Sequence, residues 1–428
     1  MTGMHPDDVA RYIARGTKLL SRALRGRAGR VSMLISEQFL YAVSNFAVTA
    51  ILAQHLHVDE FAVYAAGYAV TMLLVTLHQA ALCDSLFVFP QLVKRREPRR
   101  LWVLISIVLF VAMLLFAGGA IALGGSIGLM TGVGLGIFAP ASLNQYMRRY
   151  NQARKRYLPP LVAALLYTIS VYAFTWLLVS TDAPALHKML FPQFVGFLTA
   201  GIINWLAARR GEAVVGEIHL DRTFWRSVSR FSVILFINSF IAWLPTNVYQ
   251  WLFFLSNNTL EASVFRIIQT NLVPYFLIMG ALSGPVSQSF QRNGIDRKAV
   301  AGLAVLLCLP LVGAAFLLVI GSPLIALIFG AQYPGLGPLA AFASLCVIPA
   351  FACSLFGMWL RAQHMTSIVI IGSLINLIVL LTIGMPIASQ IGLYTVFLTI
   401  AGGSLLALAG LTIPYLLVRR RRNAMNNV

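Results

Sequence analysis

Long apolar stretches separated by short polar segments dominate the pattern of hydrophobic and polar positions along this chain. Each of twelve stretches approaches or exceeds 20 residues, the length that a helix needs to cross roughly 30 Å of hydrocarbon. The predicted membrane-spanning helices cover residues 31–56, 61–90, 101–121, 124–147, 159–180, 189–208, 227–255, 261–290, 299–320, 336–360, 365–387 and 391–418. The pattern therefore predicts an all-α polytopic membrane protein with about 12 transmembrane helices.

Arginine and lysine residues occur in alternate connections between the predicted spans. Of 32 basic residues, all but Lys188 and Arg266 lie in the two termini or in the loops that follow even-numbered spans. Positive residues collect on the cytoplasmic side of membrane proteins. We therefore predict that both termini are cytoplasmic.

The alternation of basic loops also indicates that the third and fourth spans are two separate helices. Only a Gly-rich stretch around Gly124 and Gly125 divides them. If these two spans were one, the basic residues that follow them would lie on the outer side. We therefore expect two helices with a break at the glycines.

Composition and charge exclude several classes of protein. With 59% hydrophobic and 11% charged residues, the chain is that of an integral membrane protein, and its net charge of +19 lies at membrane edges, where anionic lipid headgroups are the ordinary partner. We expect no binding of nucleic acid. All four cysteines fall within spans, so neither disulfides nor a metal site are expected.

The connections between spans are short. None exceeds roughly 20 residues, and no GxxxxGK[ST] phosphate-binding loop is present. The chain therefore lacks a soluble catalytic domain. We expect a protein that is not an enzyme, needs no cofactor and works through its helices within the bilayer.

The chain also divides near its middle. The longest polar stretch between two spans lies there, and a Glu-x-x-Val-aromatic pattern at 60–64 recurs at 261–265, six spans later. Two parallel repeats around a central cavity would follow from this arrangement. We predict a cytoplasmic amphipathic basic segment at 1–30, a six-helix N-terminal lobe at 31–210, a cytoplasmic linker at 211–226, a six-helix C-terminal lobe at 227–418 and a cytoplasmic basic tail at 419–428.

Ionisable residues inside spans are costly, and they usually face a cavity. Glu37 lies about 10 Å inside the first span at 1.5 Å per residue, and Asp84 lies at a similar depth in the second. Two carboxylates at matching depth are candidates for coupling transport to protons or to a cation. The alternative is that nearby hydroxyls, or basic residues such as Lys94, satisfy each of them.

Arg266 is the basic residue predicted to lie within a span, roughly 8 Å below the outer surface at 1.5 Å per residue. Its fork of donors suits a phosphate group, and the alternative is a side chain that extends to the outer headgroups. Polar residues of the second, seventh and eighth spans complete the predicted cavity lining, although each could instead form hydrogen bonds between packed helices. They are Gln269, Tyr64, Tyr68, His78, Asn238, Asn247 and Gln250.

Two segments carry a family resemblance. The sequence LAQHLHVDEFAVYAAGYAVTMLLVTLHQA from Leu52 is similar to a helix, short acidic loop and "eFg-x-Y" helix pattern, and PLIALIFGAQYPGLGPL from Pro323 is similar to an "lfG-x-x-Y" turn before the tenth span. In both, the chain resembles bacterial O-antigen and exopolysaccharide (Wzx-type) flippases of the multidrug/oligosaccharidyl-lipid/polysaccharide (MOP) exporter superfamily.

The resemblance implies a V-shaped cavity lined largely by spans 1, 2, 7 and 8. It implies that undecaprenyl-diphosphate-linked oligosaccharide crosses the bacterial inner membrane by alternating access. The expected partners are this lipid-linked substrate, anionic membrane lipids and proteins of polysaccharide synthesis. Several such flippases carry cations on the first two spans, whereas this chain has carboxylates there, so the anion-binding prediction rests on Arg266.

Two alternatives remain open. A cation-coupled multidrug antiporter of the same superfamily fits the membrane carboxylates better, although it fits Arg266 and the basic charge less well. A membrane-embedded glycan polymerase or ligase is the alternative from another class of protein. The short outer loops, which hold few basic residues, fit such an enzyme poorly.

Overall fold

The computed structural model describes residues 27–426 apart from 90, 95, 210–221, 294–296, 364 and 387–391. Ten described helical segments are long and apolar enough to cross a membrane. They comprise α2 (Arg27–His55), α3 (Val58–His78) with its continuation η1 (Gln79–Cys83) and α4 (Ser85–Val88), α6 (Arg96–Leu123), α7 (Gly125–Ala153), α8 (Leu158–Ser180), α9 (Ala185–Arg209), α10 (Arg222–Leu255), α12 (Arg297–Phe329), α13 (Gly337–Ala362) and α16 (Leu393–Asn426).

Three more elements complete the described helices. The helix α11 (Thr259–Asn293) occupies the predicted eighth span, and α14 (Thr366–Val379) with η2 (Leu380–Gly384) occupies the predicted eleventh. The one-turn helix α5 (Gln91–Lys94) lies between α4 and α6. Helix is present at all twelve predicted segments, and the predicted fold class is confirmed.

The break between α6 and α7 lies at the predicted glycines. Gly124 and Gly125 have φ angles of 71° and 70°, in the left-handed region that side chains disfavour. The chain can therefore reverse direction without an intervening loop. Two helices form here, as the distribution of basic residues requires.

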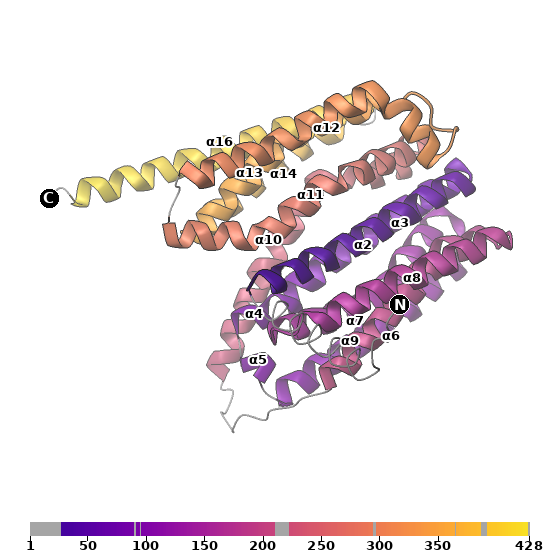
Figure 1. The fold of residues 1–428 in the computed structure, drawn as a ribbon, viewed down its shortest axis with the longest axis horizontal. Helices are drawn as coiled ribbons and strands as arrows, with labels where there is room; N and C mark the ends of the chain where they lie inside the picture. Colours follow the sequence, from indigo (N-terminus) through magenta and orange to yellow (C-terminus); the bar gives the residue numbers. More distant parts are fainter. Residues whose placement is uncertain are drawn as a thin grey trace, which may run out of the picture.

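The helices form two lobes (Figure 1). In the first lobe α7 packs on α3, α6 and α9, and α8 packs on α2 and α9; in the second, α13 packs on α12 and α16, and α14 packs on α16. The lobes meet where α10 and α11 contact α3, and where α11 and α12 contact α2. Spans 1, 2, 7 and 8 thus lie at the junction.

Two of the predicted segments lie partly on residues outside the described ranges. Residues 1–26 of the basic N-terminal segment and 210–221 of the linker lie there, and no structure is assigned to them. The helix α10 begins at Arg222, so the last part of the predicted linker, 222–226, is helical.

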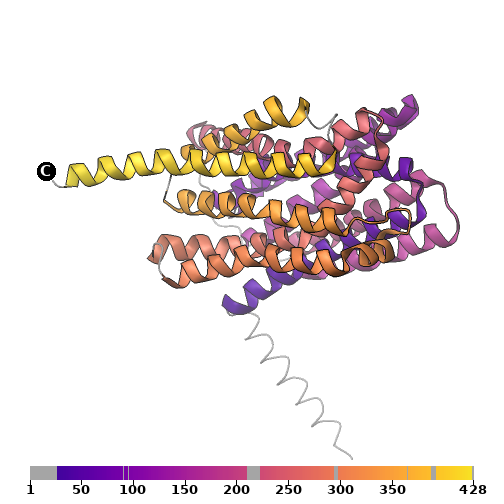
Figure 2. The same ribbon diagram turned by 90° about the horizontal axis from the view of Figure 1, so that it is seen from above.

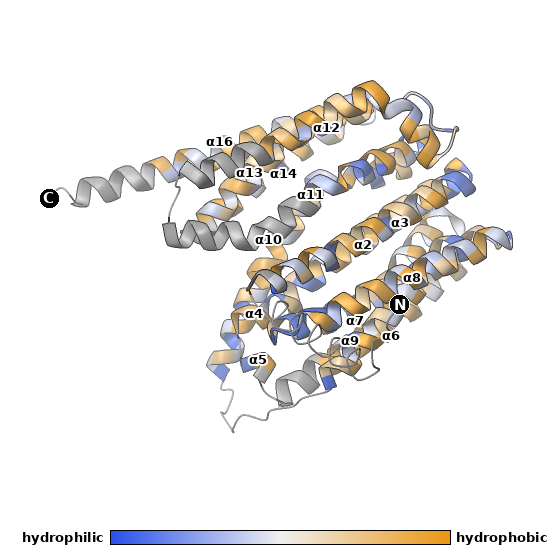
Figure 3. Cartoon of the chain, viewed as in Figure 1, coloured by the Kyte–Doolittle hydropathy of each residue, from blue (hydrophilic) through white to orange (hydrophobic). Residues whose placement is uncertain are grey.

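The helices run roughly along one direction (Figure 2), and hydrophobic residues cover most of their length, whereas hydrophilic residues gather toward several helix ends (Figure 3). Large apolar side chains are exposed on the outside, including Leu115 at 73%, Leu123 at 89% and Val319 at 79%. Such a surface is stable in hydrocarbon and costly in water. The molecule is therefore a multi-span membrane protein.

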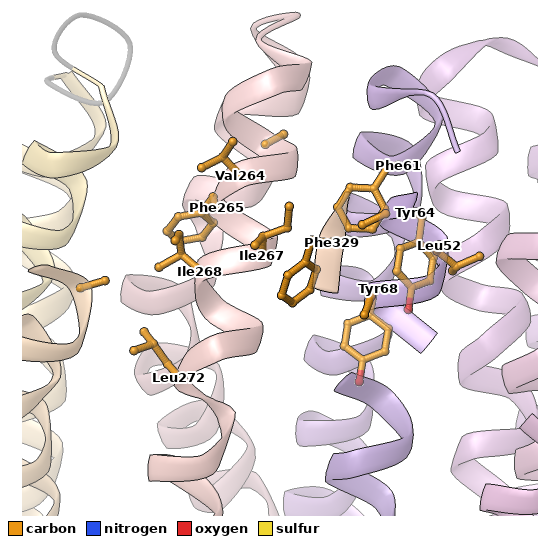
Figure 4. Close-up of a cluster of buried hydrophobic side chains, with 14 of the residues drawn as sticks. Leu52, Phe61, Tyr64, Tyr68, Val264, Phe265, Ile267, Ile268, Leu272 and Phe329 are labelled. Atoms are coloured by element: carbon orange, nitrogen blue, oxygen red, sulfur yellow. The ribbon is translucent and has the colours of Figure 1, made fainter. Parts of the chain in front are cut away.

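The lobes are joined at one end, which we call the closed end and which carries the turns 56–57, 256–258 and 330–336. Ile267 of α11 and Phe61 of α3 lie on facing sides of the junction, with Phe329 of α12 near them (Figure 4). All three are fully buried. Toward the other end the lobes diverge (Figure 1), except that α10 also contacts η1 and α4.

Two glutamines connect the lobes reciprocally at the closed end. The amide of Gln54, on α2, donates to the carbonyls of Leu327 and Ile328 at 3.1 and 2.8 Å. The amide of Gln332, in the turn after α12, donates in return to the carbonyls of Ala53 and Leu56. The last carbonyls of a helix have no partner within it, so each glutamine satisfies groups that would otherwise need water.

We expect the double substitution of Gln54→Ala and Gln332→Ala to favour separation of the lobes at the closed end. Side-chain hydrogen bonds contribute about 1 kcal/mol each, so the equilibrium should shift roughly tenfold or more. Spin labels at His57→Cys and Ala331→Cys, in a chain whose native cysteines are replaced by serine, report the distance across this end. The exposed Gln363→Ala is the matched control, and a distance distribution identical to that of the control would contradict the prediction.

Candidate functional site

Arg266 projects from α11 to the junction of the two lobes. Its guanidinium carbon lies 4.0 Å from the ring centre of Tyr68 on α3, and Nη2 donates to Thr49 Oγ1 on α2 at 3.4 Å. Both contacts are to the other lobe. The Nε is buried and has no hydrogen-bond partner in the protein.

A cavity of about 310 Å³ opens beside this arginine. Helices α10, α11, α13 and α16 form its walls, so it belongs to the second lobe. Its polar lining comes from α10 and α11, and the remaining lining is apolar apart from the thiol of Cys346. The lining residues are Thr246, Asn247, Phe265, Arg266, Gln269, Leu272, Val273, Phe276, Ala343, Cys346, Val347, Ala350, Phe397 and Ile400.

The two side-chain amides that line the cavity are already hydrogen-bonded to backbone carbonyls. Gln269 donates to the carbonyl of Thr246 at 2.9 Å, and Asn247 donates to the carbonyl of Trp243 at 3.0 Å. These bonds hold α11 against α10. Gln269 lies on the same face of α11 as Arg266, one turn away.

The predicted tyrosines approach Arg266 from the first lobe. Tyr64 is fully buried and accepts a hydrogen bond from the amide of Gln193, on α9, at 3.0 Å. Tyr68, 4% exposed, lies beneath the guanidinium. An aromatic face attracts a cation, so these residues fix the position of Arg266 without neutralising its charge.

Sequence reasoning missed Thr49 and Gln193. A hydroxyl in a span commonly bonds to the carbonyl one turn earlier, as Thr49 does to Asn45 at 2.8 Å, so nothing in its sequence position indicated a second role. Gln193 belongs to the sixth span, outside the four spans that had the most polar faces. Its uncommon polarity within an apolar stretch was the available signal.

A second polar cluster lies inside the first lobe around Glu37. This carboxylate is fully buried, lies 3.4 Å from Nη1 of Arg148, and accepts a hydrogen bond from the amide of Gln152 at 2.8 Å. The guanidinium of Arg148 also lies over the ring of Tyr41 at 5.3 Å. Both partners of Glu37 come from α7.

Asp84 has a different environment, at the end of η1. Its Oδ1 lies 3.5 Å from the amide of Gln79, and the guanidinium of Arg149 is close enough to interact with it electrostatically. Gln79 in turn accepts a hydrogen bond from Gln145 on α7 at 2.8 Å. Each carboxylate is thus associated with its own arginine, and no direct contact between the two is found among the described residues.

The sequence interpretation placed Arg148 and Arg149 in a loop, whereas α7 continues to Ala153 and holds both within the helix. Arg148 is 7% exposed. The apolar pattern ends several residues before the helix does, because paired charges replace apolar contacts in its last turns. The first lobe therefore holds two arginines, both on α7, within a membrane-spanning helix that the sequence interpretation had ended before them.

Three predicted cavity residues lie elsewhere. His78 packs against Phe138 and contacts Cys83 of the same helical segment, and its Nε2 has no partner. Gln250 is fully buried and donates to the carbonyl of Ala262 at 2.8 Å, which joins α10 to α11. Asn238 is half-buried on α10. None of the three lines the cavity beside Arg266.

No family model matches this chain, and no curated protein matches it. Several solved structures do. An inward-facing multidrug resistance MATE family transporter of the MOP superfamily is 14% identical, over 91% of this chain and 96% of its own, with a TM-score of 0.69. Lipid II flippase MurJ, in an inward closed conformation, is 13% identical over 89% and 87%, with a TM-score of 0.63.

An outward-facing MATE family transporter of the same superfamily is 14% identical over 93% of this chain and 96% of its own, with a TM-score of 0.59. The chain has the fold of MOP superfamily transporters, and these structural neighbours are transporters and flippases rather than enzymes.

Loss of Arg148 should strongly destabilise the protein. Removing one partner of a buried ion pair leaves an uncompensated charge, and we expect Arg148→Ala to lower the free energy of unfolding by about 3–5 kcal/mol. The double substitution of Glu37→Gln with Arg148→Gln should recover most of this loss. Thermal and denaturant unfolding of the purified protein in detergent measures both.

The ion pair of Lys188 and Asp182 gives the matched control, because its atoms lie 3.1 Å apart but Asp182 is fully exposed. Water and salt screen the exposed carboxylate, so Asp182→Asn should have little effect. If Arg148→Ala unfolds like Asp182→Asn, Arg148 does not stabilise Glu37.

Proposed function

We propose that this protein is a flippase that moves undecaprenyl-diphosphate-linked oligosaccharide across the bacterial inner membrane by alternating access. The observation that carries the proposal is Arg266, a cation with a buried, unpaired Nε that contacts the first lobe and also lines a cavity of the second lobe. The fold of MOP superfamily transporters supports it. The resemblance of the two sequence segments to polysaccharide flippases supplies the substrate class.

The chemistry of Arg266 suits a diphosphate. A guanidinium binds two phosphate oxygens with its planar fork, and its charge acts more strongly where apolar walls exclude water. The cavity supplies such walls, and Tyr68 and Thr49 orient the group without carrying a negative charge. An anionic headgroup that reorients the guanidinium would also give the buried, unpaired Nε a partner.

The arrangement of the lobes suits alternating access. If the predicted topology holds, the closed end faces away from the cytoplasm, and the lobes diverge toward the cytoplasm, where a lipid-linked precursor is assembled. Rocking of two rigid lobes about the junction would then expose the Arg266 cavity to the other side. Both termini and the basic loops would remain cytoplasmic.

The environment of Glu37 favours an anionic substrate over a cationic one. The carboxylate is fully buried, and Arg148 and Gln152 occupy its oxygens. A cation entering this site would have to displace an arginine. The first lobe therefore offers no open carboxylate at Glu37 to attract a cationic drug.

A cation-coupled multidrug antiporter is the second candidate. The mainly apolar lining of the cavity beside Arg266 favours it, since such walls accept apolar drugs. In this case the carboxylates Glu37 and Asp84 would take up a coupling ion. The two candidates differ in the charge that the substrate must carry.

Deletion of the gene in its host tests the flippase. We expect loss of surface polysaccharide and accumulation of lipid-linked oligosaccharide on the inner leaflet, both restored by the wild-type gene. Arg266→Ala should fail to complement, because a hydrogen bond to a charged group is worth about 1.5–3 kcal/mol, or roughly 10–100-fold in affinity. Arg266→Lys should complement in part, and Lys188→Ala serves as the control. Unchanged polysaccharide with altered drug sensitivity would support the antiporter instead.

Ion coupling is tested in proteoliposomes that contain the purified protein. If Glu37 and Asp84 couple transport, an imposed proton or sodium gradient should accelerate flipping by the wild type, and the double variant Glu37→Gln with Asp84→Asn should lose that response. The single variant Asp84→Asn separates the two carboxylates. A flipping rate that changes with neither gradient and with neither substitution would exclude coupling through these carboxylates.

A further inference from the structure

We propose that the cavity beside Arg266 binds an apolar segment attached directly to a phosphate, which in the proposed substrate is the prenyl chain next to the diphosphate and not the glycan. This inference rests on the proposed function and adds which part of the substrate the second lobe recognises. It assigns the glycan to the space outside this cavity.

The distribution of polar groups around the cavity is the first support. Arg266 lies on one wall, and the walls from α13 and α16 are apolar, with Val347 and Phe397 among their residues. Val347 is 6% exposed and Phe397 is 3% exposed. A ligand that fits must therefore present an anion on one side and hydrocarbon on the other.

The hydrogen bonds already made inside the cavity are the second support. Gln269 and Asn247 donate to backbone carbonyls of α10, so these amide donors are engaged within the protein. A sugar placed here would bury several hydroxyls beside apolar side chains, and each unpaired hydroxyl costs about 1–3 kcal/mol by mutational measures. Isoprene units carry no such groups.

Size is the third support. A volume of about 310 Å³ lies at the lower end of the roughly 300–1,000 Å³ range of small-molecule pockets. It admits one compact apolar moiety beside the phosphate and leaves no room for an oligosaccharide. A pocket of this kind discriminates by the group next to the phosphate and tolerates different glycans.

The test compares two probes with the same anion, farnesyl phosphate and N-acetylglucosamine 1-phosphate, for binding to the full-length protein in nanodiscs. We expect farnesyl phosphate to bind at least tenfold more tightly than the sugar phosphate, after subtraction of its partition into empty nanodiscs. A change in tryptophan fluorescence reports binding, because Trp243 lies one turn before the lining residue Asn247 on α10.

Val347→Phe fills the cavity and should abolish the preference for farnesyl phosphate without lowering the affinity for the sugar phosphate. The matched control is Leu345→Phe on the same helix, where the native side chain is 42% exposed and an aromatic ring meets no cavity. Alkylation of Cys346, which lines the cavity, should be slowed by farnesyl phosphate in a chain whose other three cysteines are serine.

Equal or tighter binding of the sugar phosphate, or unchanged farnesyl phosphate binding in Val347→Phe, would overturn the inference and leave the flippase proposal standing. If Arg266→Gln weakens neither probe, the proposed anion site itself is wrong. Dodecyl phosphate tests whether the pocket requires a prenyl chain or accepts any apolar chain next to a phosphate. Binding as tight as that of farnesyl phosphate supports the apolar pocket and assigns it to amphipathic anions in general.

Discussion

The energetic cost of placing charge inside a membrane organises this structure. Three arginines in membrane-spanning helices have different environments: Arg266 lies over the ring of Tyr68, Arg148 pairs with Glu37, and Arg149 lies near Asp84. The three differ in what they leave open. Carboxylates offset the charge of the two arginines on α7, whereas Arg266 has only an aromatic face and a hydroxyl, so its positive charge remains for a ligand.

The position of Arg266 links ligand binding to movement of the lobes. It belongs to the second lobe, yet its protein contacts at Tyr68 and Thr49 belong to the first. If Arg266 binds an anion as proposed, the anion would compete with these contacts and weaken the junction from within. A ligand shifts a conformational equilibrium only by its difference in affinity for the two states, and this competition would supply such a difference.

Much of the fold could be predicted, because a helix must be long and apolar to span a bilayer and because Gly124 and Gly125 permit an abrupt reversal. Arg266 was identifiable as a charge in an apolar segment. The pairing of Glu37 with Arg148 was not, since it depends on how α2 packs against α7. The apolar cavity wall was equally hidden, because Val347 inside the cavity and Leu345 outside it have the same hydropathic character in sequence.

The hydrogen bonds within the first lobe differ from those that Gln54 and Gln332 make between the lobes, and this difference suits rocking of rigid bodies. Inside the lobe, Asn144 donates to Tyr41 and accepts from Asn204, and all three are buried where water cannot replace their partners. At the closed end, Gln54 is exposed and Gln332 binds carbonyls at a helix terminus that water can reach. Breaking the buried bonds would cost their full desolvation, whereas the terminal ones exchange with water at about 1 kcal/mol each. The junction can therefore open while each lobe keeps its shape.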